Sequence, residues 1–162
     1  MNIIEADFSD PVHSEAIIKL LNDYALDPMG GGKELSDFVK TSLTKELQKR
    51  DGAHAILAFI DGEAAGLLIS FEGFSTFACR PLINIHDIVV TSRHRGKGLA
   101  KKMLQMLEEI ALGLGCCKLT LEVLEGNSAA QAAYKSFGFA GYELDPEVGK
   151  AMFWEKKLKH KE

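Results

Sequence analysis

The sequence lacks several features that would point to particular classes of protein. Its 162 residues include only three cysteines, and two of them, Cys116 and Cys117, are adjacent. This odd number and spacing give neither a disulfide framework nor a set of metal ligands, so we expect a reducing compartment and no metal. No segment approaches the roughly 18 to 20 uninterrupted apolar residues of a membrane span, and the N-terminus has no basic segment followed by an apolar one. These absences predict a cytoplasmic protein with no membrane partner.

The sequence also lacks an excess of positive charge. Its formal net charge is -4 and its pI is about 5.8. Because phosphate binding needs a cationic surface, we expect no nucleic-acid partner, and a cationic substrate fits an acidic protein better. Apolar residues make up 46% of the chain and charged residues 26%, as in ordinary globular proteins. Length and composition together predict a single domain over residues 1–162.

Apolar periodicity and turn residues predict an alternation of strands and helices. Strands are expected at residues 3–4, 53–60, 63–71, 82–90 and 119–123, with two more between 142 and 158 and an irregular stretch at 73–81. Helices are expected from Pro11 up to Asp27, over Leu35–Arg50, from Gly98 to about Leu114 and from Asn127 to about Phe137. This order predicts an α/β (α+β) fold, a mixed central β-sheet of about seven strands flanked by about four helices.

A basic, glycine-bearing turn joins the predicted strand 82–90 to the helix that follows. The turn reads Arg93-His94-Arg95-Gly96-Lys97-Gly98-Leu99-Ala100. At a helix N-terminus several backbone N–H groups have no intrahelical partner, and the helix dipole favours negative charge. Glycines at 96 and 98 let a ligand approach the backbone closely. The turn therefore predicts a pyrophosphate cradle, although the same pattern also occurs in ordinary strand-to-helix connections.

Two familiar nucleotide-binding motifs are excluded by the residues of this turn. A Walker loop needs Lys-Ser or Lys-Thr after its last glycine, whereas here Gly98 is followed by Leu99. A dinucleotide fingerprint needs G-x-G-x-x-G within a βαβ unit, and the strands predicted before this turn form a hairpin instead.

The turn resembles the acetyl-CoA signature of the GNAT acetyltransferase superfamily, Q/R-x-x-G-x-G/A. The resemblance implies a GNAT-type sheet and acetyl-CoA as cosubstrate. It implies that the main chain of Ile88, Val89 and Val90 pairs with the pantetheine arm and the thioester carbonyl. It implies that the CoA pyrophosphate is held by Arg95, Gly96, Lys97, Gly98, Leu99 and Ala100.

A second motif lies downstream and looks like the second GNAT motif at its usual distance from the first. The pattern N-x-x-A-x-x-x-Y-x-x-x-G-F is filled by Asn127, Ala130, Tyr134, Gly138 and Phe139. Taken alone, Asn127 suits a helix N-cap and Tyr134 a core aromatic with a hydrated hydroxyl. The resemblance adds cofactor contacts at Asn127 and Ala130. It makes Tyr134 the general acid for the leaving thiolate and the Ile88 amide the oxyanion donor.

Three residues compete for the role of general base. Glu122 has a spacing to the second motif similar to that of ribosomal-protein N-terminal acetyltransferases, whose strand glutamate is the base; it also suits a plain strand-end carboxylate. His86 and Asp87 resemble the Glu-Asp pair of polyamine and glucosamine-phosphate acetyltransferases, with histidine replacing glutamate. Adjacent residues of a regular strand face opposite sides of the sheet, so only one of this pair could face the pocket. All three candidates stay open.

The sequence thus predicts an N-acetyltransferase that moves an acetyl group from acetyl-CoA to a small primary amine, polyamine-like or an amino acid, by direct attack on the thioester. The carboxylates would attract a cationic acceptor. One alternative is a protein or peptide N-terminal acetyltransferase, in which the loops at 30–32 and 71–81 would shape or block a peptide groove. Another is a non-catalytic acyl-CoA-binding module on the same fold. Exposed strands near the C-terminus would favour a homodimer.

Overall fold

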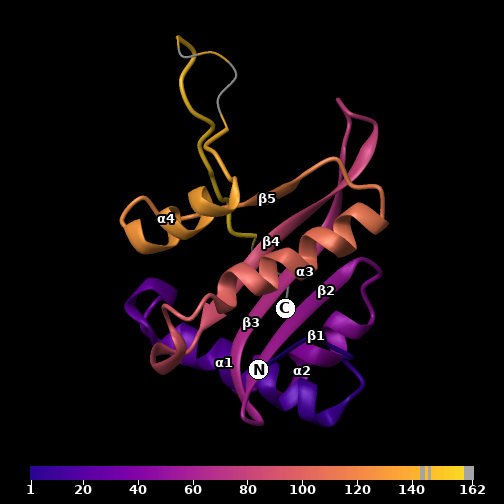
Figure 1. Cartoon of the computed structure of the whole chain (residues 1–162), viewed down its shortest axis with the longest axis vertical. Coiled ribbons are helices and arrows are strands. Elements are labelled where there is room, and N and C mark those ends of the chain that lie inside the picture. The colour runs from indigo at the N-terminus through magenta and orange to yellow at the C-terminus, as the bar shows by residue number, and fades with distance from the viewer. Residues whose placement is uncertain (143–144, 146, 159–162) are drawn as a thin grey trace. The chain divides into compact units, whose positions relative to one another are not determined.

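The computed structural model describes residues 1–142, 145 and 147–158 (Figure 1). Backbone contacts divide the chain into two compact units, Met1–Asn127 and Ser128–Glu162, and each is described by itself. The first unit holds the sheet and three of the helices, and the second begins with α4 (Ser128–Phe137). A single domain over the whole chain stays a prediction.

One mixed five-stranded sheet, in the order β1-β2-β3-β4-β5, is the framework of the first unit. Its strands are β1 (Asn2–Glu5), β2 (Ala53–Ile60), β3 (Glu63–Ser75), β4 (Arg80–Val90) and β5 (Leu119–Leu121). The first four pair antiparallel, whereas β5 runs parallel to β4. The β2–β3 turn is the Asp61-Gly62 dipeptide, with φ of 51° and 83°, as tight hairpins require.

The helices of this unit are α1 (Pro11–Leu26), α2 (Asp37–Gln48) and α3 (Leu99–Gly113), with short 3-10 turns at Pro28–Gly30 (η1) and Ser92–His94 (η2). Two of them, α1 and α2, begin at capping side chains. The Asp10 carboxylate accepts from the amides of Val12 and His13 at 2.7 and 3.3 Å. The Ser36 hydroxyl accepts from the amide of Val39 at 3.3 Å. Each cap satisfies amides that the helix leaves unpaired.

Helices cover both faces of the sheet, with α1 on one face and α3 on the other (Figure 1). On the α1 face, Ile17 and Leu20 pack against side chains of the strands, in a cluster that includes Leu67, Ile69 and Val89. On the α3 face the closest approach is at Gly66, where an added Cβ would lie 3.0 Å from Cε of Met103. We call these the α1 face and the α3 face below.

The hairpin of β3 and β4 is longer than the sequence predicted. We expected an irregular stretch at 73–81, and this prediction is wrong at both ends, because the pairing of β3 with β4 continues to Ser75↔Arg80. The hairpin can extend this far because its outer part has no neighbouring strand on either side among the described residues. The pairing of β2 ends at Phe71 and that of β5 begins at Ile83, so this part of the hairpin is a two-stranded ribbon in which Pro81 is tolerated.

The C-terminal segment differs from the sequence prediction of two strands between 142 and 158. Its described residues form no strand, apart from a single bridge at Lys150, while residues 143, 144 and 146 lie outside the described residues. The Asp145 carbonyl instead accepts from the amides of Val148 and Gly149 in a turn. The predicted mixed α/β fold is confirmed, with five strands in the described residues rather than about seven.

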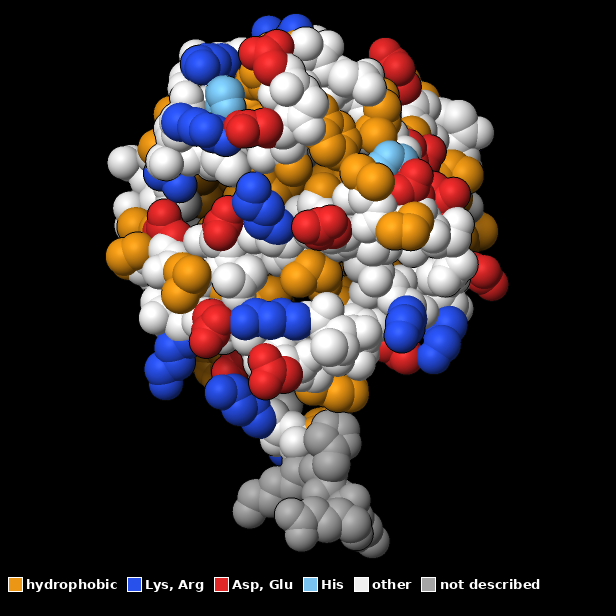
Figure 2. All heavy atoms as spheres, turned by 90° about the horizontal axis from the view of Figure 1, so that it is seen from below, with side chains coloured by type: hydrophobic (Ala, Val, Ile, Leu, Met, Phe, Trp, Pro, Cys, Tyr) orange, Lys and Arg blue, Asp and Glu red, His pale blue; other side chains and the backbone are white. Residues whose placement is uncertain are grey.

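Acidic and basic side chains alternate over the face of the molecule shown in Figure 2. Several of the ion pairs are local, such as those that Glu46 makes with Lys49 at 2.7 Å and Arg50 at 3.3 Å. Pairs of this exposed kind contribute little to stability. Among the helices that the structure describes, none has the length and apolar character needed to cross a membrane.

Candidate active site

The pairing of β4 with β5, the edge strand of the described sheet, ends part-way along β4. Their parallel pairing runs from Ile83↔Leu119 to Ile85↔Leu121, and the amide side chain of Asn84 donates to the Thr120 hydroxyl at 2.8 Å there. Strand β4 continues to Val90, and no other described strand pairs with the edge it presents beyond Ile85. Ile88, Val89 and Val90 lie on this stretch. An open strand edge of this kind can pair with an extended ligand.

A β-bulge at His86 interrupts β4 just after its pairing with β5 ends. Ile69 pairs with Asp87 and Ser70 with Ile85, so His86 is the extra residue on β4. Asp87 therefore shares the α1 face with Ile69. The His86 ring meets the ring of Phe71 edge-on, with centroids 4.7 Å apart, and Phe71 packs against the α1-face cluster.

Both members of the His-Asp pair thus lie on the α1 face. We expected that only one of the two could face a pocket, which assumes a regular strand. That assumption is wrong for β4, because the bulge adds a residue between two ladder positions. Burial raises the pKa of Asp87 above its usual value, and the neighbouring His86 opposes that rise. A half-buried carboxylate with a raised pKa is suited to accept a proton near neutral pH.

The turn after β4 has the geometry of an anion cradle. Gly96 and Gly98 both have φ of 75°, in the left-handed region that glycine adopts without strain. No neighbouring atom lies within 4 Å of where a Cβ would stand at either glycine, so open space surrounds this backbone. Gly98 is the N-cap of α3, and no side chain caps the amides of its first turn, which starts at Leu99 and Ala100. Uncapped amides beside an open turn fit a diphosphate.

The basic side chains of the turn are engaged with the rest of the first unit. Arg95 donates through Nε to the Val90 carbonyl at 3.2 Å and through Nη2 to Asp27 Oδ2 at 3.3 Å. Arg93 forms an ion pair with Glu63, and Lys97 Nζ lies 3.2 Å from Nδ1 of His94. These contacts hold the turn against neighbouring elements while its backbone faces open space.

The third candidate base, Glu122, lies directly after β5. Leu121 is the last residue of β5 and pairs with Ile85, so Glu122 follows at the level of the bulge, and its side chain is exposed. The structure therefore brings His86 and Asp87 together on one face and places Glu122 where the two strands part.

The second motif falls around α4. Asn127 immediately precedes this helix, at the N-cap position, and its amide donates to the Leu124 carbonyl at 2.9 Å. Within the second unit, Ala130 is half-buried on α4, and the Tyr134 and Phe139 rings meet edge-on with centroids 6.0 Å apart. The roles of Asn127, Ala130 and Tyr134 beside the cofactor stay predictions.

Tyr24, in the last turn of α1, is a residue of this region that the sequence did not single out. In the sequence it belonged to the apolar stripe of a helix, and only its hydroxyl, which needs a polar partner when buried, could have marked it. Burial, followed by the negative charges of Asp87 and Asp27, raises the pKa of the Tyr24 phenol. The Tyr24 phenol therefore interacts electrostatically with the Asp87 carboxylate at the bulge.

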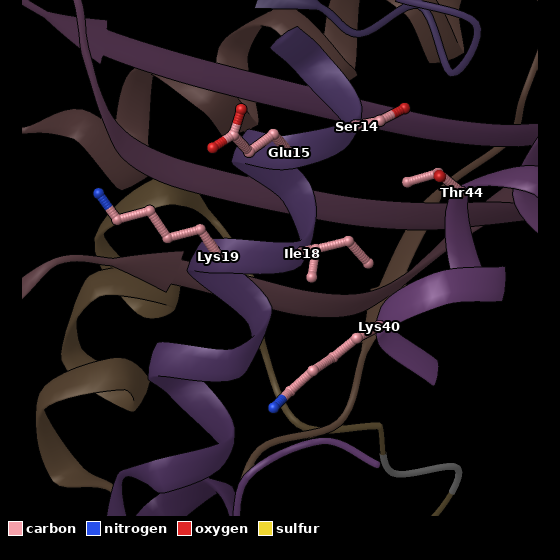
Figure 3. A pocket seen from close by; sticks show the side chains of 6 residues that line it. All are labelled: Ser14, Glu15, Ile18, Lys19, Lys40 and Thr44. Atoms are coloured by element: carbon pink, nitrogen blue, oxygen red, sulfur yellow. The ribbon is translucent and has the colours of Figure 1, made fainter. Parts of the chain in front are cut away.

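A shallow groove of about 370 Å³ lies between α1 and α2 (Figure 3). Its lining residues are Ser14, Glu15, Ile18, Lys19, Lys40 and Thr44. None of the residues predicted for the active site lines it, so this groove is separate from the bulge and the cradle.

Comparison with known proteins agrees with this geometry. Residues 16–139 match the model of the Acetyltransferase (GNAT) family. The mouse thialysine N-epsilon-acetyltransferase is 32% identical over 124 residues, which cover 65% of this chain and 72% of that protein.

Two solved structures show the same fold. An aminoglycoside acetyltransferase from an uncultured soil metagenomic sample, in complex with sisomicin, has a TM-score of 0.79 at 16% identity, covering 98% of this chain and 96% of that one. An aminoglycoside N-acetyltransferase in complex with CoA has a TM-score of 0.73 at 17% identity, covering 97% and 95%. The family match spans both the bulged strand and the glycine turn, and this chain therefore belongs to the GNAT family of acetyltransferases.

Proposed function

We propose that this protein transfers the acetyl group of acetyl-CoA to the primary amine of a small molecule. The observation that carries the proposal is the pairing of two features on β4: a carboxylate turned to the α1 face by the bulge, and an open glycine turn at the strand's end. The names of the mouse relative and of the sisomicin complex both specify small amino compounds, which supports the small-molecule class.

The residues of the first unit fit acetyl-CoA. The amides from Gly96 to Ala100 would hold the diphosphate, since both glycines are left-handed and open. The open edge of β4 at Ile88, Val89 and Val90 would hold the pantetheine arm. When bound, acetyl-CoA supplies the activated acetyl thioester.

The chain itself would supply three functions to the transfer. The pair formed by Asp87 and His86 would accept the proton of the acceptor ammonium, directly or through water, so that a neutral amine can attack. The Ile88 amide would donate to the oxygen on which negative charge develops. The Tyr134 hydroxyl would give its proton to the sulfur that leaves.

A thiol-release assay with a panel of amines tests this proposal. We expect turnover with at least one of thialysine, lysine, spermidine or an aminoglycoside, each at saturating acetyl-CoA. Turnover confined to peptides with free N-termini would instead favour the N-terminal acetyltransferase alternative. Calorimetric binding of CoA without turnover of any amine would favour the non-catalytic module.

A further inference from the structure

We propose that Tyr24 and Asp87 together form the subsite that holds the ammonium group of a cationic acceptor. This inference rests on the proposed acetyl transfer and adds a recognition residue from α1, outside both sequence motifs. The partner is an alkylammonium group, recognised by one carboxylate and one phenol.

The first observation is that Arg95 joins the ends of the two elements that carry these residues. Its guanidinium bonds the Val90 carbonyl at the end of β4 and the carboxylate of Asp27 just after α1. The Asp27 amide in turn donates to the Tyr24 carbonyl at 3.0 Å. The last turn of α1, with Tyr24, is therefore fixed beside the last residues of β4, which follow Asp87.

The second observation is that the two side chains share one face. Tyr24 packs against the α1-face cluster that includes Ile69 and Val89. Asp87 lies opposite Ile69 and two residues before Val89, on the same face of β4. The negative charge of Asp87 acts on the Tyr24 phenol, as expected of neighbouring groups.

The third observation is that both groups lack a protein partner. Within residues 1–142, 145 and 147–158, neither the Tyr24 hydroxyl nor the Asp87 carboxylate forms a hydrogen bond, although both side chains are half-buried. Polar groups that are shielded from solvent find partners in the protein, in water or in a ligand. Two carboxylates act on the Tyr24 phenol, those of Asp87 and Asp27. Asp27 is paired with Arg95, so Asp87 is the one of the two that is available to a ligand. A carboxylate and a phenol together favour a cation.

The charge next to this subsite also selects for a single ammonium group. The Arg95 guanidinium is held nearby by Asp27 and would repel a cation placed against it, whereas Asp87 attracts one. We therefore expect this subsite to bind the amine of the acceptor that reacts, and not another ammonium group farther along the same molecule.

Calorimetry on the full chain saturated with CoA tests the subsite, using thialysine, lysine and spermidine as probes. We expect at least one probe to bind. The substitutions Tyr24→Phe and Asp87→Asn should each weaken it about tenfold, since the first removes one hydrogen bond to a charged group and the second removes the negative charge that attracts it. Affinity for CoA should not change. Asp23→Asn is the matched control, because it removes an exposed carboxylate from the neighbouring position of α1, and it should leave probe affinity as it is.

Three results would overturn the subsite: wild-type affinity in Tyr24→Phe, an equal loss in Asp23→Asn, or no binding of any of the three amines to the wild type. Circular dichroism and thermal unfolding of each variant check that Tyr24→Phe has not disturbed α1. The same titrations without CoA separate this inference from the proposed function. Failure to bind CoA or to release thiol would remove acetyl transfer, while amine binding that depends on Tyr24 would still support the subsite.

Discussion

Arg95 and Asp27, 68 residues apart in the chain, form an ion pair of 3.3 Å that links the turn after β4 to the end of α1. The same guanidinium also donates to the Val90 carbonyl at the end of β4. One side chain of the glycine turn therefore contacts both elements that carry the proposed acceptor subsite. The Arg95 side chain is exposed and that of Asp27 partly so, and surface ion pairs add little to overall stability. Its effect should therefore be on geometry.

The substitution Arg95→Lys tests that effect. A lysine keeps the charge but cannot donate in two fixed directions, so one of the two bonds is lost. We expect KM to rise about fivefold for acetyl-CoA and for the amine, the equivalent of about 1 kcal/mol, with little change in the melting temperature. Steady-state kinetics with each substrate varied in turn provides the measurement. If both KM values were unchanged, the two contacts of Arg95 would have no functional role.

The open glycine turn makes a prediction about backbone conformation. Gly98 has φ of 75°, and an alanine there would be strained even though no atom lies close to its Cβ. We expect Gly98→Ala to cost about 1–2 kcal/mol and to weaken CoA binding about tenfold. Gly113→Ala is the matched control, because Gly113 ends α3 without a left-handed φ and also has open space. It should leave CoA affinity unchanged, and similar losses in both variants would contradict the cradle.

The proposed general acid makes a kinetic prediction. Tyr134→Phe removes only the hydroxyl and keeps the ring that meets Phe139. We expect kcat to fall about a hundredfold, in the range usual for acid–base groups, with little change in CoA affinity. A pre-steady-state assay of thiol release, with calorimetry for CoA, measures both quantities. Wild-type kcat in this variant would remove Tyr134 from the mechanism.

His54 predicts a pH dependence of stability. Its Nδ1 and Nε2 atoms each lie 2.9 Å from a carboxylate oxygen, of Glu5 and Glu72 respectively. Burial is the largest single influence and lowers the pKa of His54, but the hydrogen bonds and charges of both glutamates outweigh it. The net pKa lies above the usual 6.5.

The sign of the effect follows from that upward shift. The charged form is favoured by folding, so the stabilisation is complete below the unfolded pKa of about 6.5 and is lost as pH rises through the higher folded value. We expect the wild type to lose stability as pH rises above about 6.5 and His54→Gln to show a flatter profile over the same range. Urea unfolding at a series of pH values provides the measurement. Parallel profiles would show that the imidazole does not link the three strands through its charge.

Features fixed by near neighbours in the chain could be predicted from the sequence. The caps at Asp10 and Ser36 and the hairpin turn at Asp61-Gly62 depend on a few consecutive residues, and all three are present. The glycine turn before α3 was predictable for the same reason.

Features fixed by distant pairing could not be predicted. The bulge at His86 exists only in the register between β3 and β4, so reading β4 alone gave two opposite faces. The contact between Arg95 and Asp27 depends on how α1 packs on the sheet. Tyr24 looked like any residue of an apolar stripe until its hydroxyl was placed near Asp87.

The extra residue in β4 also separates two kinds of sequence change. Replacing His86 or Asp87 alters which atoms are offered to a substrate but leaves them where they are. Deleting His86 would make the strand regular, and the pairs Ser70↔Ile85 and Ile69↔Asp87 would then follow one another directly, so every residue would keep its side of the sheet. Ile83 and Ile85 would stay in the interior, so a change of length at this point would remove the local bend and added twist of β4 without disturbing the core. New acceptor preferences should therefore arise here through loss of the extra residue as well as through substitutions.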